Sequence, residues 1–440
     1  MVQFHVGASS GRFRQVGRAR RRRPYNKPIH PSSWRAFDKA TNEGHNTSKQ
    51  VGKDPGKHIR SDSQRVFNMS RLDRILRPRI IWTCVRIALV CGLLTASAAA
   101  QDAAGQIKAQ IEQLQTSLKS IPASFPGASD IKPQIDKQLQ AASDALRSGR
   151  LYLSLENLAS VIDTLQGMRE VGTKSEAVKS AGFEPEWGKA STELTALDQK
   201  LRETKWDDAP AAIRALAEAA QGKMIPLLEG GHGFATASGA EAGLFYVGQA
   251  RGEADFAQFC AGLNVSRESP PLPLHSVMPE LEQLQVKTND AFQPPRSIDL
   301  HSRFIRLNSA LKLAQELDAD GFHAGALYAY LVSTLHYGLL DAPALGDAQQ
   351  SNLPAAIAAA RAKLKSSGRD DSIAELFLER AESEITPANG SRPAPDDWRS
   401  AEVILSQVLP AYAAALQRPE PTAPPSAKHV EITLVRWPYT

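Results

Sequence analysis

The sequence predicts an all-α protein: an array or bundle of antiparallel helical hairpins, preceded by a disordered basic segment and followed by a short extended, β-like tail. Apolar residues recur at steps of three and four along most of residues 101–418. Strand-type alternation is almost absent from that region, and short connections containing glycine or proline separate the periodic segments. The chain of 440 residues is long enough for such helices to bury a core.

The first segment, residues 1–68, is basic and has no apolar periodicity. It holds 15 Lys and Arg against 4 Asp and Glu, including the run Arg20-Arg21-Arg22-Arg23. We expect it to be disordered, because it offers little apolar surface to bury. An alternative interpretation is that Met69 is the true start and that residues 1–68 are a mis-called upstream translation.

Residues 69–100 have the three parts of an export signal in order. An arginine-rich stretch precedes the apolar run Ile87–Ala96, and small residues follow it. The predicted cleavage region is Ala98, Ala99, Ala100 and Gln101. If the signal is not cleaved, residues 80–96 would remain as an anchor and make the only membrane contact. We therefore expect a periplasmic or secreted protein, or one anchored to the inner membrane.

An N-terminal helical region is predicted over residues 101–266. Its first helices carry clear apolar stripes, such as Ile107, Ile111, Leu114, Leu118 and Ile121. The glycine-rich residues 230–239 predict a flexible loop that ends a helix. The next helix, Glu241–Leu263, is expected to break near Gly252.

A proline-rich connection with a short helix is predicted over residues 267–297, before a C-terminal helical region at 298–418. Its expected helices are Ile298–Leu317, Ala324–Leu340, Leu353–Ser366, Asp371–Ile385 and Asp396–Gln417. Residues 419–440 form a proline-rich linker and an extended tail, in which Val430, Ile432 and Leu434 alternate with other residues. The tail could pack on its own body or add to the edge of another sheet.

Three predicted turns share a glycine followed, five positions later, by a small residue. The pairs are Gly149 with Ser154, Gly252 with Ala257, and Gly321 with Ala326. Glycine permits the reversal of the backbone, and the small residue lets the second helix approach the first. This pattern resembles the tetratricopeptide repeat, in which a large apolar residue follows, as Leu158 and Tyr330 do here. The resemblance covers the chain in fragments and implies an array of helical hairpins.

The charge of the folded part argues against nucleic-acid binding. Residues 101–440 hold 42 Asp and Glu against 32 Lys and Arg, a net charge of −10. A phosphate backbone would be repelled by this part, in which no local basic patch is visible in the sequence. We expect another protein as the partner, and no nucleic acid.

No catalytic, metal-binding or cofactor-binding motif is found in residues 101–440. Cys260 is the one cysteine there, and its apolar neighbours predict a buried side chain. The aspartates before Gly321 mimic a calcium loop, but Leu327 stands where the bidentate glutamate is needed. The segment Gly230–Gly233 lacks the context of a phosphate cradle. His232 is left as a weak candidate for a ligand site.

Two functional hypotheses follow from these observations. The first is an exported, non-catalytic interaction or scaffold module of the cell envelope, for which we expect no cofactor. The alternative is an exported small-ligand-binding protein or enzyme, with its site near Gly230–Gly239 and His232.

Overall fold

The computed structural model describes residues 103–122, 128–265, 267, 269–293, 300–388 and 390–418. The chain divides into two units, residues 1–52 and 53–440, and all described residues belong to the second. Those residues form helices and their connections, with no strand among them, which confirms the all-α prediction. The basic segment 1–68, the export signal with Ala98–Gln101, and the tail 419–440 lie outside the described residues.

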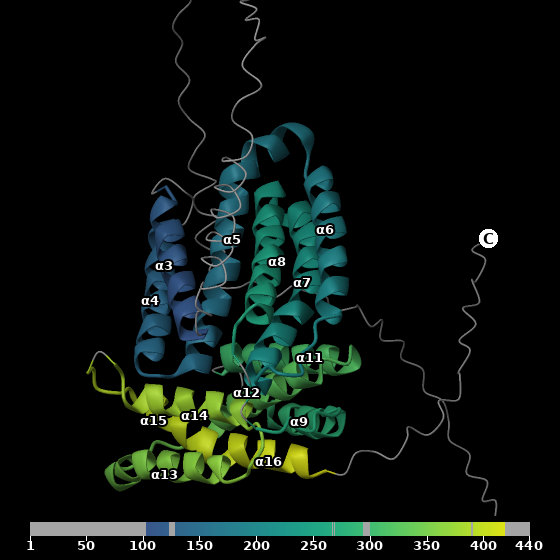
Figure 1. Ribbon diagram of the computed structural model, residues 1–440. Coiled ribbons are helices and arrows are strands. Elements are labelled where there is room, and N and C mark those ends of the chain that lie inside the picture. The colour runs from purple at the N-terminus through teal and green to yellow at the C-terminus, as the bar shows by residue number, and fades with distance from the viewer. Residues whose placement is uncertain are drawn as a thin grey trace, which may run out of the picture. The chain divides into compact units, whose positions relative to one another are not determined.

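The first group of helices contains the long elements α5, α7 and α8, with α3 and α4 on one side and α6 on the other (Figure 1). Within this group α4 packs against α3 and α5, and α6 packs against α7 and α8, while α8 makes its most extensive contacts with α5 and α7. The group comprises α3 (Ala103–Ser120), α4 (Ala128–Arg147), α5 (Leu151–Ala181), α6 (Glu184–Arg202), α7 (Ala211–Ser238) and α8 (Ala240–Ala261).

The second group lies across the lower end of the first in Figure 1. It comprises α9 (Met278–Ala291), α11 (His301–Ala319), α12 (His323–Asp341), α13 (Asp347–Lys365), α14 (Ser372–Ile385), α15 (Pro395–Val403), the π-helical turn η1 (Ile404–Val408) and α16 (Leu409–Gln417). One uninterrupted helix was predicted over 396–417. The π turn lies just before Pro410, which has no N–H to donate to Ser406 and whose ring crowds that carbonyl.

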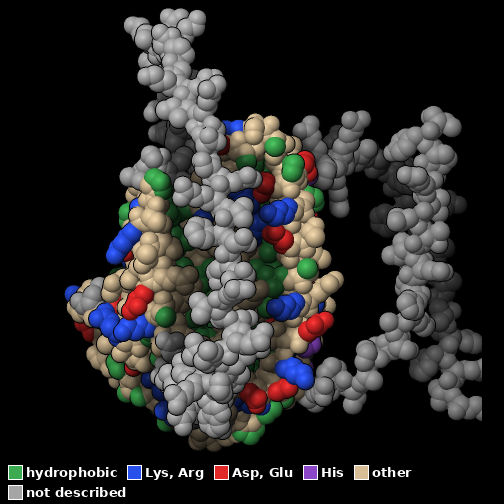
Figure 2. All heavy atoms as spheres, turned by 45° about the horizontal axis from the view of Figure 1, so that its top comes forward, with side chains coloured by type: hydrophobic (Ala, Val, Ile, Leu, Met, Phe, Trp, Pro, Cys, Tyr) green, Lys and Arg blue, Asp and Glu red, His purple; other side chains and the backbone are tan. Residues whose placement is uncertain are grey.

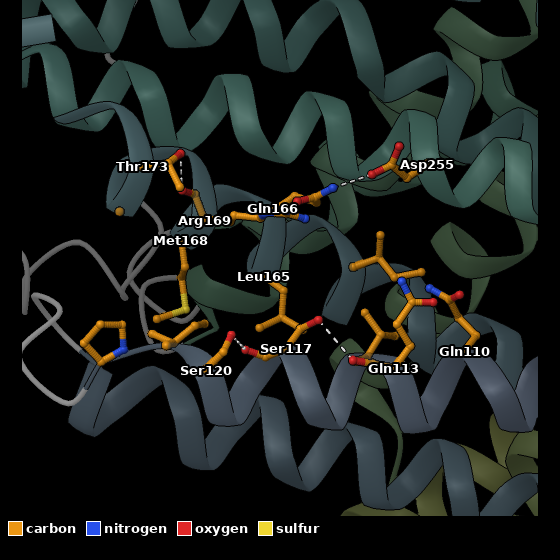
Figure 3. Close-up of a pocket in the computed structure, with 15 residues that line it drawn as sticks. Gln110, Gln113, Ser117, Ser120, Leu165, Gln166, Met168, Arg169, Thr173 and Asp255 are labelled. Atoms are coloured by element: carbon orange, nitrogen blue, oxygen red, sulfur yellow. Dashed lines mark hydrogen bonds between the residues drawn. The ribbon is translucent and has the colours of Figure 1, made fainter. Parts of the chain in front are cut away.

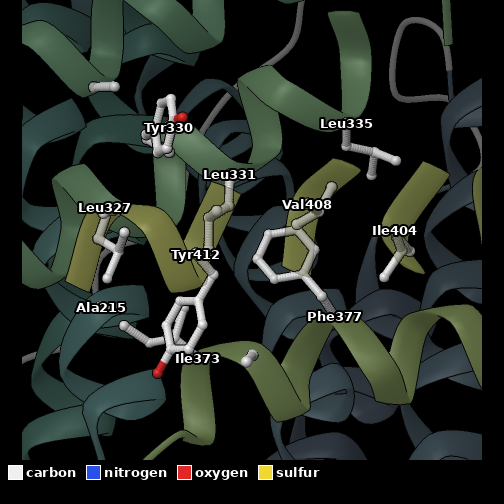
Figure 4. Close-up of a cluster of buried hydrophobic side chains, with 14 of the residues drawn as sticks. Ala215, Leu327, Tyr330, Leu331, Leu335, Ile373, Phe377, Ile404, Val408 and Tyr412 are labelled. Carbon is white, nitrogen blue, oxygen red and sulfur yellow. The ribbon is translucent and has the colours of Figure 1, made fainter. Parts of the chain in front are cut away.

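Each group has its own hydrophobic core, and α7 contributes to both. Ala211, Ala212, Ala215 and Ala219 face the core of the second group, which Figure 4 shows around Tyr412 and Phe377. Other residues of α7, such as Ile213 and Met224, face the core of the first group. The predicted burial of Cys260 in that core is confirmed, at 2% exposure. A helix that is apolar on two faces thus joins the two groups.

Two of the three predicted glycine turns are confirmed. Gly149 connects α4 to α5 at φ 74°, and Gly321 connects α11 to α12 at φ 79°. Both values lie in the left-handed region that glycine enters without steric cost. Ser154 and Ala326 are fully buried in the second helix of each hairpin, as expected of residues at a close helix contact.

The predicted turn at Gly252 is wrong, because Gly252 lies inside the continuous helix α8. A Cβ atom added there would lie 2.4 Å from the Cα of Asp163 on α5. Gly248, one turn earlier, approaches the carbonyl oxygen of Gln166 equally closely. These glycines therefore permit backbone contact between two helices, rather than a reversal of the chain.

The predicted loop at 230–239 is also wrong. Helix α7 continues through the glycines to Ser238, and the turn falls at Gly239, with φ 97°. Gly231 is buried against Tyr246 of α8, whose ring stacks on Phe234 at 4.5 Å. Packing against α8 therefore overrides the low helix propensity of the glycines.

Four helices lack a side-chain cap of their own and receive one from a distant element. In each case a buried carboxyl oxygen accepts a hydrogen bond from a backbone N–H at or next to the helix N-terminus, where the helix itself offers no acceptor. The pairs are Glu379 with Leu153 N at 2.7 Å, Asp370 with Ala211 N at 2.6 Å, Glu218 with Gly325 N at 2.8 Å, and Asp318 with Val277 N at 2.9 Å. Asp318, part of the calcium-like sequence, thus caps α9.

Candidate functional site

A groove of about 770 Å³ runs between α3 and α5 and reaches α8. Figure 3 shows residues of α3 in a row along one wall, with residues of α5 opposite. The first wall is formed by Gln110, Gln113, Ser117 and Ser120, and the second by Leu165, Gln166, Arg169 and Thr173. We call this feature the α3–α5 groove.

The length of the groove suits a short stretch of extended chain. On α3 the lining runs from Gln110 to Ser120, and on α5 from Ile162 to Thr173. At a rise of about 1.5 Å per helical residue, each wall is roughly 15 Å long. An extended peptide rises about 3.3 Å per residue, so four or five residues would span it.

The groove combines an apolar floor with walls that are mostly amides and hydroxyls. Leu114, Ile162, Leu165 and Met168 are buried beneath it. The hydroxyl of Ser117 donates to the Gln113 carbonyl of its own helix, at 3.0 Å. No side-chain hydrogen bond occupies the amides of Gln110 and Gln113 within the described part of the chain. Each amide can therefore both donate to and accept from the backbone of a bound peptide.

Two charged residues line the groove, and they differ in their partners. The carboxylate of Asp255 on α8 accepts a hydrogen bond from the Gln166 amide at 2.5 Å, which joins the walls formed by α5 and α8. Arg169 is exposed and makes no ion pair with any residue that the structure describes. The groove therefore presents to a ligand a guanidinium that has no ion-pair partner among the described residues, and a carboxylate that keeps its negative charge.

The groove does not resemble a catalytic centre. Its lining contains no histidine or cysteine, and its one carboxylate is already held by Gln166. Nucleophilic or acid–base catalysis needs a reactive group within hydrogen-bond reach of a second, activating group. The lining residues provide no such pair.

His232 does not belong to this groove. It lies on α7, where its Nε2 is 3.0 Å from Oε1 of Glu184. Its ring contacts that of Trp187, with 4.9 Å between centroids. Its side chain is 42% exposed, so His232 sits at a polar surface contact between α6 and α7.

Sequence reasoning did not find the groove, although α3 carries a usable pattern. Gln110, Gln113, Ser117 and Ser120 repeat at steps of three and four, directly beside the apolar stripe. Such a stripe of amides and hydroxyls differs from the charged outer face of an ordinary surface helix. The opposite wall comes from a helix some 50 residues later, which the sequence pattern does not place.

A second feature is a cluster of ionisable side chains where α5, α7 and α8 meet α12 and α14. Glu156 accepts a hydrogen bond from the Tyr328 hydroxyl and pairs with Arg380, both at 2.5 Å. Lys223 pairs with Glu253 at 3.0 Å. Burial, followed by the charge of Arg380, lowers the pKa of nearby His336 to about 4. We call these groups, with Asp163, the interhelical charge cluster.

The described surface carries charges of both signs. On the face shown in Figure 2, Lys and Arg side chains are interspersed with Asp and Glu. No group of three or more His, Cys, Asp or Glu residues in the described ranges is placed to hold a metal ion. Among the helices that the structure describes, none is long and apolar enough to cross a membrane.

Comparison with known proteins gives no relative. No protein family, curated protein or solved structure matches the chain.

Proposed function

We propose that this chain is a non-catalytic interaction module that binds an extended segment of another protein in the α3–α5 groove. The supporting observation is the groove itself: a floor of buried apolar residues between walls that are mostly amides and hydroxyls, with no reactive pair among the lining residues. Apolar side chains of a ligand would contact the floor, while the glutamine amides bind its backbone.

The guanidinium of Arg169, which has no ion-pair partner among the described residues, makes the proposal more specific. A partner with a carboxylate opposite this guanidinium would gain a charge-assisted hydrogen bond. The net negative charge of residues 101–440 does not oppose this contact strongly, because salt screens distant exposed charges beyond about 10 Å. We therefore propose a peptide with an acidic residue at one end of its bound segment.

We propose the location and the architecture of this module from its sequence pattern. The predicted export signal supports a place in the cell envelope or outside the cell, as a periplasmic or secreted protein. The hairpins turning at Gly149 and Gly321, each with its small residue five positions later, support kinship with tetratricopeptide-like arrays. Such arrays commonly present concave surfaces to other proteins.

The alternative, a small-ligand site or active site at His232, has one supporting observation. His232, Glu184 and the ring of Trp187 lie together on an exposed surface, where they combine a titratable pair with an aromatic face. A ligand screen by thermal shift tests this alternative. It predicts a stabilising compound whose effect is abolished by His232→Ala.

A matched pair of substitutions tests the groove. We propose selecting binders to the immobilised full chain from a random peptide display library, then measuring their affinity for two variants. Ser117→Trp fills the groove, whereas Thr116→Trp places the same side chain on the adjacent, outward-facing position of α3. We expect at least tenfold weaker binding to the first variant only. Equal binding to both variants, or no selected binder, would contradict the proposal.

A further inference from the structure

The crossing of α5 and α8 leaves no space between the two backbones. At Gly248 an added Cβ would lie 2.4 Å from the Gln166 carbonyl oxygen, and at Gly252 the same distance from the Cα of Asp163. No side chain lies between the two backbones that could move in response to a change in repulsion. The helices themselves must therefore move.

Two carboxyl groups flank this crossing, one on each helix. Asp163 belongs to α5, and Glu253 immediately follows Gly252 on α8. The side chain of Glu253 is 3% exposed, and its Oε2 has no hydrogen-bond partner among the described residues. Burial, followed by the nearby charge of Glu253, raises the pKa of Asp163 to about 7. We call these two residues the acid pair.

The cations around the acid pair do not neutralise it. Lys223 of α7 contacts Glu253, and its charge also acts on Asp163. The guanidinium of Arg380, on α14, is engaged by Glu156, whose other partner is Tyr328 of α12. The hydroxyl of Thr164 donates to Asp163 at 2.9 Å. Two acids thus face one available cation in the described structure, and the ionised pair carries a net negative charge.

The acid pair is directly connected to the groove walls. Ile162 and Gln166, on either side of Asp163 along α5, line the groove, and so does Asp255, two residues after Glu253. The hydrogen bond from Gln166 to Asp255 spans the same two helices. Protons can reach the pair from solvent, since 39% of the neighbouring Lys223 side chain is exposed.

From this geometry we infer that proton binding at the acid pair controls the α3–α5 groove. With one proton on the pair, α5 and α8 stay in contact, and the bond between Gln166 and Asp255 holds the α5 wall of the groove against α8. Loss of the proton leaves two carboxylates that repel each other across the close backbone contact of α5 and α8. These two helices then separate, and the groove that they line loses its shape. The control of binding rests on the proposed function, whereas the movement of α5 against α8 does not.

Hydrogen exchange of the full chain tests the movement without any ligand. The probe is the protection factor of amides in residues 161–172 and 247–256, corrected for intrinsic exchange, between pH 6 and 8.5. The acid pair binds one proton, with a pKa near 7 when α5 and α8 are in contact and near 4 when they are apart. This difference predicts about a tenfold loss of protection over this pH range. The double variant Asp163→Asn with Glu253→Gln should lack this tenfold loss.

A second variant and a control complete the test. Lys223→Met removes the available cation, so the pair retains its proton to higher pH and the loss of protection should shift upward in pH. Glu176→Gln removes an exposed acid from the same helix and should leave the wild-type profile unchanged. Constant protection in the wild type, or the same loss in the double variant, would overturn the inference. A groove that responds to pH but binds no peptide would refute only the proposed function.

Discussion

Replacing Gly252 by alanine measures how tightly α5 and α8 are packed. The added methyl carbon would lie 2.4 Å from the Cα of Asp163, whereas ordinary contacts between such atoms begin near 3.4 Å. The two helices must therefore separate by about 1 Å. Overpacking of this kind costs roughly 1–3 kcal/mol, and we expect the upper end because the opposing atom belongs to the backbone.

Alanine also stabilises a helix by about 1 kcal/mol relative to glycine. The net loss in the free energy of unfolding for Gly252→Ala is therefore about 2 kcal/mol. Gly188 on α6 is the matched control, because an added Cβ there meets nothing within 4 Å. At about 2–4 °C per kcal/mol, Gly252→Ala should lower the melting temperature by roughly 4–8 °C, and Gly188→Ala should raise it by roughly 2–4 °C. Circular dichroism at 222 nm measures both. Equal stability of the two variants would refute the close crossing.

Three further predictions concern stability. Glu218→Ala should reduce the free energy of unfolding by about 3 kcal/mol, because it removes the cap on Gly325 N and leaves Arg214 without its partner. Glu218→Gln should reduce it by less, and urea denaturation compares the two variants. Burial raises the pKa of Glu379 to about 8 and that of Glu384 to about 7, so the folded chain holds protons that the unfolded chain releases. The melting temperature should therefore fall as pH rises from about 5 to above 8, and a rise across this range would show that these acids are not buried as described. His232→Ala should change the free energy of unfolding by less than about 0.5 kcal/mol, since the side chain lies at the surface with 42% of its area exposed. A loss of several kcal/mol in the same urea experiment would contradict that placement.

Local sequence patterns were sufficient to predict the helical class and two of the hairpin turns. Of the predicted stripe, Ile121 is partly buried, just past the end of α3, and the other four residues are buried, as their spacing requires: Ile107, Ile111, Leu114 and Leu118. Gly149 and Gly321 occupy the left-handed conformation for which a turn selects glycine. These features depend on residues within one or two helical turns of each other, so a single sequence contains the necessary information.

Features that depend on distant partners were missed. A glycine can reverse the chain or admit a neighbouring backbone, and only the position of α5 shows that Gly252 does the second. The cap of α5 comes from Glu379, which is 226 residues from Leu153. The groove likewise needs α3, α5 and α8 together, so the polar stripe of α3 does not by itself show which helices it faces.

The most direct test of the proposed binding module is hydrogen exchange of the full chain with and without a peptide selected from the display library. The α3–α5 groove predicts slower exchange along residues 110–120 and 162–173 when the peptide is bound. Residues 228–238, around His232, should be unaffected. Slower exchange confined to that second segment, or no change along α3 and α5, would contradict the account.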